Sequence, residues 1–118
     1  MPVPPRVRAG RSAQTLRQPL ERLYCEFDYA GRVDRDAIQY PLRYADPRDR
    51  EIVALLTACL AYGRVDLFGR ALEGVLAAMR PSPWAFVRDF DPARDAAAFA
   101  RFLYRFNRPR DLVAFCVA

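Results

Sequence analysis

The densest apolar stretch of the chain spans residues 52–62, where Thr57 is the only polar side chain. A helix that is apolar on nearly every side is typical of a buried element. Asp46 can cap the first amides of such a helix, and Pro47 suits its first position because the missing N–H would be unpaired there anyway. The pattern therefore predicts a buried central helix over about residues 47–62.

Several shorter segments also have apolar residues at every third or fourth position, the spacing of a helix with one buried face. A cap residue followed by proline repeats the start signal at Ser82-Pro83 and at Asp91-Pro92. Between these helices, residues 32–45 predict a short extended or single-turn segment. The pattern thus predicts an all-α fold of about five or six short helices, the flanking ones lying over about residues 15–29 and 65–79, after each of the two cap–proline pairs, and over residues 111–118.

Length and composition fit one domain, because 118 residues leave room for one modest core and 53% hydrophobic residues exclude a disordered protein. Residues 1–14 contain prolines, a glycine and arginines without apolar periodicity. They predict a disordered basic tail, followed by a single helical domain over residues 15–118. From Leu112 to Ala118 every residue is apolar, with no cap glycine, basic last turn or polar tail. We therefore expect a domain truncated at its C-terminus, with an exposed apolar surface.

The charge of the chain is concentrated at its start. All 19 basic residues are arginine, and 14 acidic residues leave a net charge of +5. Residues 1–20 hold four of the arginines and no acid, so the remainder has fifteen arginines against fourteen acids, a net charge of +1. A positive charge favours a polyanionic partner such as nucleic acid, but the near-neutral remainder gives this inference little weight.

The residue types exclude several chemistries. The chain has no lysine for a Schiff base and no histidine for a catalytic triad. The widely spaced Cys25, Cys59 and Cys116 form no Cys-x-x-Cys pair, so we expect no metal site and no cofactor. Cys59 and Cys116 lie in apolar segments, where a thiol acts as a small hydrophobe, which predicts reduced cysteines in a cytoplasmic protein. No signal peptide and no apolar run of the roughly 20 residues needed to cross a membrane is found.

Residues 99–110 alternate aromatic side chains with arginines and contain no acidic residue. Arginine binds phosphate through two parallel hydrogen bonds and stacks on bases, and aromatics between arginines suit single-strand binding. The alternative is an ordinary solvated helix face, because helical spacing would turn the phenylalanines of residues 99–106 to the core. The candidate nucleic-acid-binding residues of this stretch are Arg101, Arg105, Arg108 and Arg110.

A second candidate is Tyr62-Gly63-Arg64, at the end of the central helix. A glycine after a helix end lets the backbone approach a ligand closely; the alternative is a plain helix cap with Tyr62 half buried. A third cluster, the acids and arginines of residues 46–51, could perform acid–base chemistry through paired carboxylates. Cap and surface ion-pair roles are favoured there, so no catalytic residue is assigned.

The segment from Leu42 to Val65 resembles the signature of an uncharacterised bacterial family, domain of unknown function 2400. Its most specific pieces are the start, Tyr-x-Asp-Pro-x-Asp-Arg-Glu-Ile-Val, and the end, Leu-Ala-Tyr-Gly-Arg-Val. Pro81-Ser-Pro83, and Tyr104-Arg-Phe-Asn107 followed by Asp111-Leu112, fit the family further along. Together the matches cover about residues 20–118.

Full-length members of this family resemble helix-hairpin-helix DNA glycosylases of the endonuclease III type, in which a buried helix precedes a short loop facing the DNA minor groove. The resemblance implies that residues 46–62 form that helix and that Tyr62-Gly63-Arg64 lies near the loop. It also implies that family members continue with a Leu-Asp-Thr-His-like segment and a region resembling the hairpin motif, which would supply the acidic residue and most phosphate contacts. Some glycosylase relatives carry an iron–sulfur cluster, for which the cysteine spacing here gives no support.

Three functional hypotheses stay open. The favoured one is that the chain is the N-terminal part of an incomplete helix-hairpin-helix glycosylase-like domain, with no catalytic activity of its own. The second is a small nucleic-acid-binding helical module, with DNA as its partner. The third is a protein-interaction module that pairs through its apolar C-terminal helix, either with a second copy or with a separately encoded second half.

Overall fold

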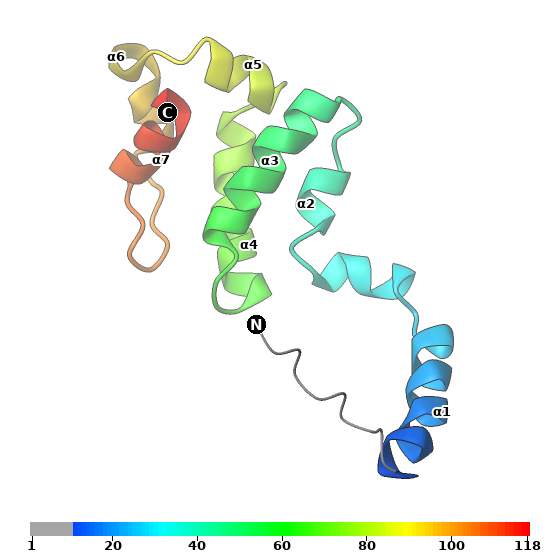
Figure 1. Cartoon of the computed structure of the whole chain (residues 1–118). Coiled ribbons are helices and arrows are strands. Elements are labelled where there is room, and N and C mark those ends of the chain that lie inside the picture. The colour runs from blue at the N-terminus through cyan, green and yellow to red at the C-terminus, as the bar shows by residue number, and fades with distance from the viewer. Residues whose placement is uncertain (1–10) are drawn as a thin grey trace, which may run out of the picture. The chain divides into compact units, whose positions relative to one another are not determined.

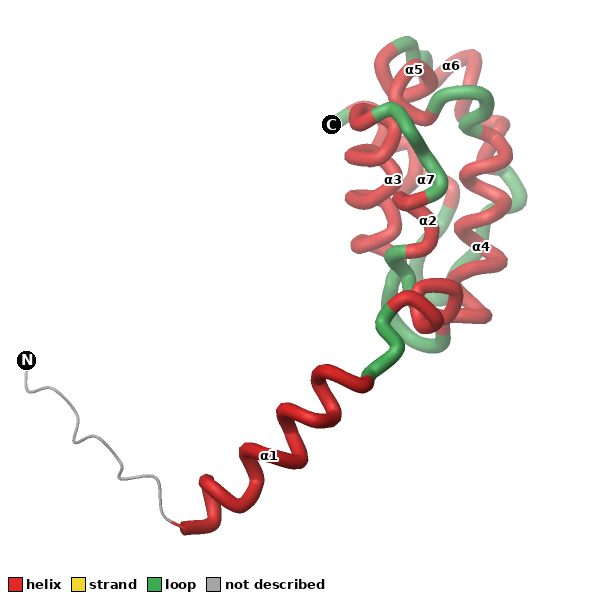
Figure 2. Tube along the Cα trace, turned by 90° about the vertical axis from the view of Figure 1, so that its right-hand side faces the viewer, coloured by secondary structure: helices red, strands yellow, loops and turns green. Residues whose placement is uncertain are grey.

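The structure, a computed structural model, describes residues 11–118, and in this part of the chain it is built from helices without a strand (Figure 2). The all-α fold class is thus confirmed. Residues 11–118 contain seven α-helices, of which five have six residues or more, in agreement with the predicted five or six short helices. In chain order the elements are α1 (Arg11–Glu26), η1 (Ala30–Arg35), α2 (Gln39–Leu42), α3 (Pro47–Leu60), α4 (Val65–Ala78), α5 (Pro83–Arg88), α6 (Pro92–Asp95), η2 (Ala96–Phe99) and α7 (Pro109–Val117), where η is a 3₁₀ helix.

Two compact units divide the chain, Met1–Arg32 and Val33–Ala118. The first contains α1, which begins at Arg11, so the last four residues of the predicted 1–14 tail are helical and the others lie outside the described residues. The helix continues through Pro19. The predicted domain over residues 15–118 stays a prediction.

The second unit is arranged around α3, whose predicted start is confirmed. The Asp46 side chain accepts a hydrogen bond of 2.8 Å from the Arg48 amide, and Pro47 takes the first helical position. One turn later a carboxylate ties α3 to α5, because Asp49 accepts bonds from the Ser82 hydroxyl at 2.6 Å and from the Trp84 amide at 2.9 Å. α4 then runs beside α3 in the opposite direction (Figure 1).

The core lies where α3 meets α2, α4 and α5, and it continues to η2 and α7. Close approach to another residue explains one of the two glycines of α4 and not the other. A side chain at Gly69 would collide with the hydroxyl of the buried Tyr40, whereas at Gly74 no atom lies within 4 Å of the place a Cβ would take. The buried apolar residues are Tyr40, Val53, Leu56, Leu60, Phe68, Leu72, Val75, Leu76, Met79, Phe99, Phe102, Tyr104, Leu112 and Cys116.

The prediction that α3 is buried on nearly every side is wrong for one face. Val53, Leu56 and Leu60 are buried, but Leu55 is 56% exposed and Cys59 is exposed. The buried residues of α3 recur at every third or fourth position, so its neighbours cover one face and leave the face with Leu55 and Cys59 open. Cys59 therefore does not take the role of a buried hydrophobe that its sequence context predicts.

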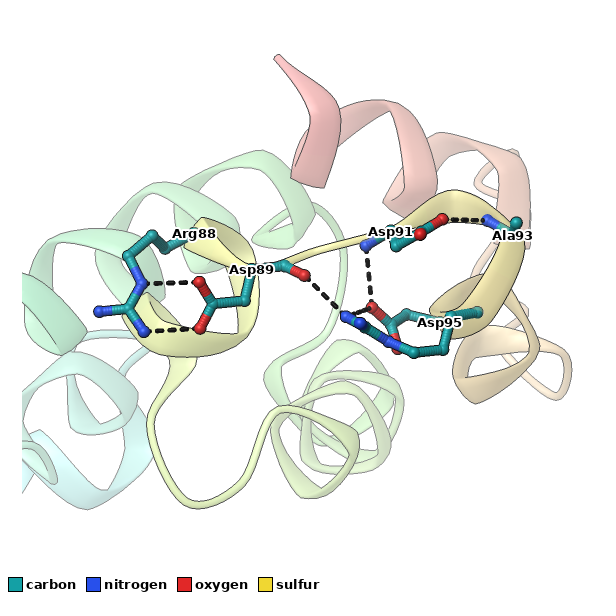
Figure 3. A network of polar contacts seen from close by, with 6 residues as sticks. Arg88, Asp89, Asp91, Ala93 and Asp95 are labelled. Atoms are coloured by element: carbon teal, nitrogen blue, oxygen red, sulfur yellow. Dashed lines mark hydrogen bonds and ion pairs between the residues drawn. The ribbon is translucent and has the colours of Figure 1, made fainter.

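Both cap–proline helix starts are confirmed. Ser82 accepts a hydrogen bond of 3.1 Å from the Ala85 amide at the start of α5, and Asp91 accepts one of 2.8 Å from the Ala93 amide at the start of α6. In Figure 3 Asp95 closes the α6 turn by accepting from the Asp91 amide at 2.9 Å. The long helix predicted after Asp91-Pro92 is wrong, because α6 and η2 end at Phe99.

Candidate nucleic-acid interface

The α3–α4 loop requires its glycine. Gly63 has a φ of 87°, in the left-handed region that side chains disfavour. A Cβ at this residue would also lie 2.8 Å from Nη2 of Arg105, so the guanidinium of Arg105 rests directly against the Gly63 backbone. The same guanidinium carbon lies 6.0 Å from the centre of the Tyr62 ring. A second loop, residues 100–108, brings Arg105 to Tyr62 and Gly63, which lie about 40 positions earlier in the sequence.

This second loop forms a tight turn in place of the predicted helix. The Asn107 amide donates to the Tyr104 carbonyl at 2.9 Å, and the Tyr104 amide donates back at 3.4 Å, which makes an isolated antiparallel bridge. Between them Arg105 has a φ of 50°, an unusual value for a residue with a side chain. Arg105 and Phe106 therefore occupy the tip of the turn.

Two tyrosines explain why the chain leaves the helix. The Tyr104 hydroxyl donates to the Tyr62 carbonyl, and the Tyr62 hydroxyl donates to Oδ1 of Asn107. The two rings lie 5.1 Å apart. A continuous helix through residues 99–106 could not make these bonds, so tertiary contacts with the α3–α4 loop replace the local helical preference. In Figure 1 both loops lie at the same end of the α3–α4 pair.

The turn changes which aromatic side chains are buried. Phe99 and Phe102 lie in the core, but Leu103 is 65% exposed and Phe106 is 88% exposed. The alternative in which all the phenylalanines of residues 99–106 face the core is therefore wrong for Phe106. A phenylalanine with this exposure is one of the most solvent-accessible large apolar residues of the described chain.

The structure brings together some of the predicted site residues and separates others. Tyr62, Gly63 and Arg105 are in contact, and Nη1 of Arg108 donates to the Arg105 carbonyl at 3.0 Å, which adds Arg108 to the group. Arg64 follows directly in the loop, where it forms an exposed ion pair of 2.9 Å with Asp66.

Arg101 and Arg110 do not join this group through any contact in the described residues. Arg101 lines a pocket beside α4, and Arg110 is exposed in the first turn of α7. Three further members of the site were not predicted: Tyr104 and Asn107 as its hydrogen-bonding partners, and Phe106 as its exposed tip. The asparagine was a usable signal, because asparagine favours turns.

The charged cluster at the start of α3 has the cap and ion-pair roles that the sequence favours. Asp46 pairs with Arg48 at 2.8 Å, and this hydrogen bond lowers the pKa of the Asp46 carboxyl to about 2. The Arg48 guanidinium in turn lies 4.1 Å from the centre of the Trp84 ring, with that of Arg88 at 4.5 Å. Arg50 donates to the Tyr44 carbonyl at 2.8 Å. Asp46, Arg48 and Arg50 therefore take part in contacts that stabilise the fold.

Within residues 15–118, no cluster of three or more histidine, cysteine or acidic side chains is arranged to hold a metal ion. Cys25 and Cys59 are exposed, and burial raises the pKa of the Cys116 thiol to about 11. None of the described helices has the length and apolar character needed to cross a membrane. A pocket of about 610 Å³ beside α2 and α4 is lined in part by charges that are already paired, Arg64 with Asp66 and Glu73 with Arg43.

A family model described as "Protein of unknown function (DUF2400)" matches residues 36–118, which include α3, both loops and α7. The chain belongs to the DUF2400 family. This confirms the family resemblance read from the sequence, while the relation to helix-hairpin-helix glycosylases stays a prediction. No curated protein and no solved structure matches the chain. In this DUF2400 chain two of the segments that carry the resemblance, Leu60–Val65 and Tyr104–Asn107, are in contact with each other.

Proposed function

We propose that this DUF2400 protein is a DNA-binding helical module that contacts DNA through its two adjoining loops, residues 62–64 and 104–108. The observation that carries the proposal is Phe106, a phenylalanine 88% exposed at the tip of a hydrogen-bonded turn. Arg105 and Arg108 flank it, and the Tyr62 contacts hold the turn in place.

The chemistry of this surface suits nucleic acid. An exposed aromatic ring can stack on a base or enter between two base pairs, and arginines beside it can bind the phosphates on either side. The missing side chain of Gly63 leaves room for the Arg105 guanidinium to rest against the backbone beside the turn. Two arginines with no acid between them, at residues 105–108, make the tip positive even though the charge of the rest of the chain is nearly balanced.

The resemblance to helix-hairpin-helix DNA glycosylases supports the same ligand, because it also assigns the loop after α3 to the DNA-facing side. The proposal covers binding and assigns no catalytic group. A cytoplasmic location would give such a module access to bacterial DNA. The proposal treats three further arginines as secondary contacts, which reach DNA only if it extends beyond the two loops: Arg64, Arg101 and Arg110.

Fluorescence anisotropy with a labelled duplex and the matching single strand tests the proposal. Replacing the ring in F106A is expected to weaken binding about 5- to 150-fold, since stacking on one base is worth about 1–3 kcal/mol. R108Q is expected to reduce the salt dependence of binding by about one phosphate contact. The control is R80Q, which removes an exposed arginine from the segment between α4 and α5.

The two substitutions separate stacking from charge. If F106A binds as the parent does, or if R80Q loses as much affinity as R108Q, the turn is not the DNA-contacting surface. A chain lacking residues 1–10 measures the contribution of the basic N-terminus. Loss of all binding in that variant would assign DNA binding to the tail and contradict the proposal.

One observation favours the third hypothesis as a second candidate function, self-association. The open face of α3 presents Leu55 and Cys59 to solvent, and a groove of about 170 Å³ between α3 and α7 is lined by Leu60, Leu112 and Phe115 among others. A second copy of the chain offers the same face, and homodimers commonly pair identical patches.

A further inference from the structure

A pocket of about 460 Å³ lies between α4 and residues 97–103, and the DNA-binding proposal makes no use of it. Its walls are unusually small side chains. Ala71 and Gly74 line it from α4, and Ala97, Ala98 and Ala100 line it from the other side. The buried rings of Phe99 and Phe102 also contribute to its lining. These residues give the pocket an apolar wall on which a flat ring could rest.

Two arginines, Arg70 and Arg101, also line the pocket. Neither guanidinium makes a hydrogen bond or ion pair with the part of the chain that the structure describes. Arg70 stands between two carboxylates of its own helix, Asp66 and Glu73; the hydrogen bond from Arg64 lowers the pKa of Asp66, and the charge of Arg70 adds a smaller effect. Both carboxylates form ion pairs with other arginines, Asp66 with Arg64 at 2.9 Å and Glu73 with Arg43 at 2.6 Å.

The glycine at position 74 of α4 is the third feature that points to a ligand in this pocket. Glycine inside a helix costs about 1 kcal/mol relative to alanine. At Gly74 nothing lies within 4 Å of the place that a Cβ would take, so neighbouring protein atoms do not require glycine there. Gly74 is exposed and lines the pocket, so a side chain there would enter open space beside the pocket wall.

We propose that this pocket binds a small organic anion, a compound with one phosphate or carboxylate group and a flat ring. Arg70 and Arg101 hold the anionic group, since guanidinium pairs with both kinds of anion through two parallel bonds. The ring lies along the alanine wall, in the space left open by Gly74. This site is independent of the DNA-contacting turn, because its residues other than Arg101 belong to none of the proposed DNA contacts.

Isothermal titration calorimetry on the full chain tests the anionic group and the ring of the proposed ligand separately. Phenyl phosphate carries both, inorganic phosphate carries only the anionic group, and benzyl alcohol carries only the ring. We expect phenyl phosphate to bind at least tenfold more tightly than either of the other two compounds. Benzoate in a fourth titration shows whether a carboxylate serves as well as a phosphate. Absence of phenyl phosphate binding at millimolar concentration, or equal binding of inorganic phosphate, would overturn the proposal.

Substitutions place the site. R101Q is expected to weaken phenyl phosphate binding about tenfold or more, because a charged hydrogen-bonding partner is lost. G74L fills the pocket without meeting protein atoms at its Cβ, so it should abolish binding while the helix keeps or gains stability. The matched control is A77L, at an exposed position of α4 outside the pocket.

These variants leave no ambiguity with unfolding or with DNA binding. A melting temperature of G74L at or above that of the parent shows that loss of binding is not loss of fold. F106A should bind phenyl phosphate as the parent does, because Phe106 does not line the pocket. If G74L and A77L bind the compound equally well, it sits elsewhere and the assignment fails.

Discussion

Gly63 and Gly74 differ in what surrounds the missing side chain, and their alanine variants should therefore change stability in opposite directions. G63A forces a side chain into a φ of 87° and against Arg105, which we expect to lower the free energy of unfolding by about 1–3 kcal/mol. G74A adds a Cβ to open space in a helix and should raise it by about 0.4–1 kcal/mol. Urea unfolding followed by circular dichroism measures both, and shifts of the same sign would contradict this account.

Residue by residue, local chemistry was predictable and distant pairing was not. Asp46, Ser82 and Asp91 cap helices because their own side chains reach amides two or three residues away, a relation that sequence spacing contains. The bond from the Tyr62 hydroxyl to Asn107 joins residues 45 positions apart, and no local pattern encodes it. The turn that we propose to contact DNA rests on that bond, so its residues were identified only in part.

At the scale of the helix, acid should weaken the start of α3. The Arg48 hydrogen bond lowers the pKa of Asp46 to about 2, below the ordinary value of 3.8 that an unfolded chain would have. The unfolded state therefore takes up the proton first, and the charge of Asp46 stabilises the fold fully above about pH 4. That contribution is lost as the pH falls from about 4 to about 2.

D46N tests this pH dependence, because asparagine keeps an acceptor for the cap and loses the charge. We expect the parent to have the higher urea midpoint at pH 7 and the difference to shrink toward zero near pH 2. R80Q is the control, since it removes no group that titrates in this range and its difference from the parent should stay constant. A D46N difference that is the same at pH 7 and pH 2 would contradict the assignment of the shift to Arg48.

The helices that were predicted correctly are those whose signals lie within them. α3, α4 and α7 begin and end within about two residues of expectation, because apolar period and proline starts are local features. The segment after Asp91 has the alanines and the apolar spacing of a helix, yet it ends in a turn because Tyr104 and Asn107 bond to the α3–α4 loop. The apolar composition of α3 also predicted burial on every side. It could not show that one face has no neighbouring element, because the sequence pattern does not say which elements cover a face.

For the molecule as a whole, the described residues leave an apolar surface uncovered. Leu55 on α3 is 56% exposed, and Val117 at the end of α7 is 61% exposed. The sequence predicted such a surface from the apolar end of the chain, and α3 adds a second part that was not foreseen. Exposed apolar patches on soluble proteins mark interaction sites or cause aggregation. Net charge gives little protection, since fifteen arginines and fourteen acids follow residue 20.

The purified chain should therefore associate with itself and bind a hydrophobic dye such as anilinonaphthalene sulfonate. L55E places a charge in the middle of the open α3 face, and we expect it to shift the mass measured by sedimentation velocity toward the monomer and to reduce dye fluorescence. L67E is the matched control, because Leu67 is an exposed leucine on α4, 41% accessible. A parent chain that stays monomeric at every concentration and binds no dye would rule out self-association through this face. If L67E had the larger effect, the contact surface would belong to α4.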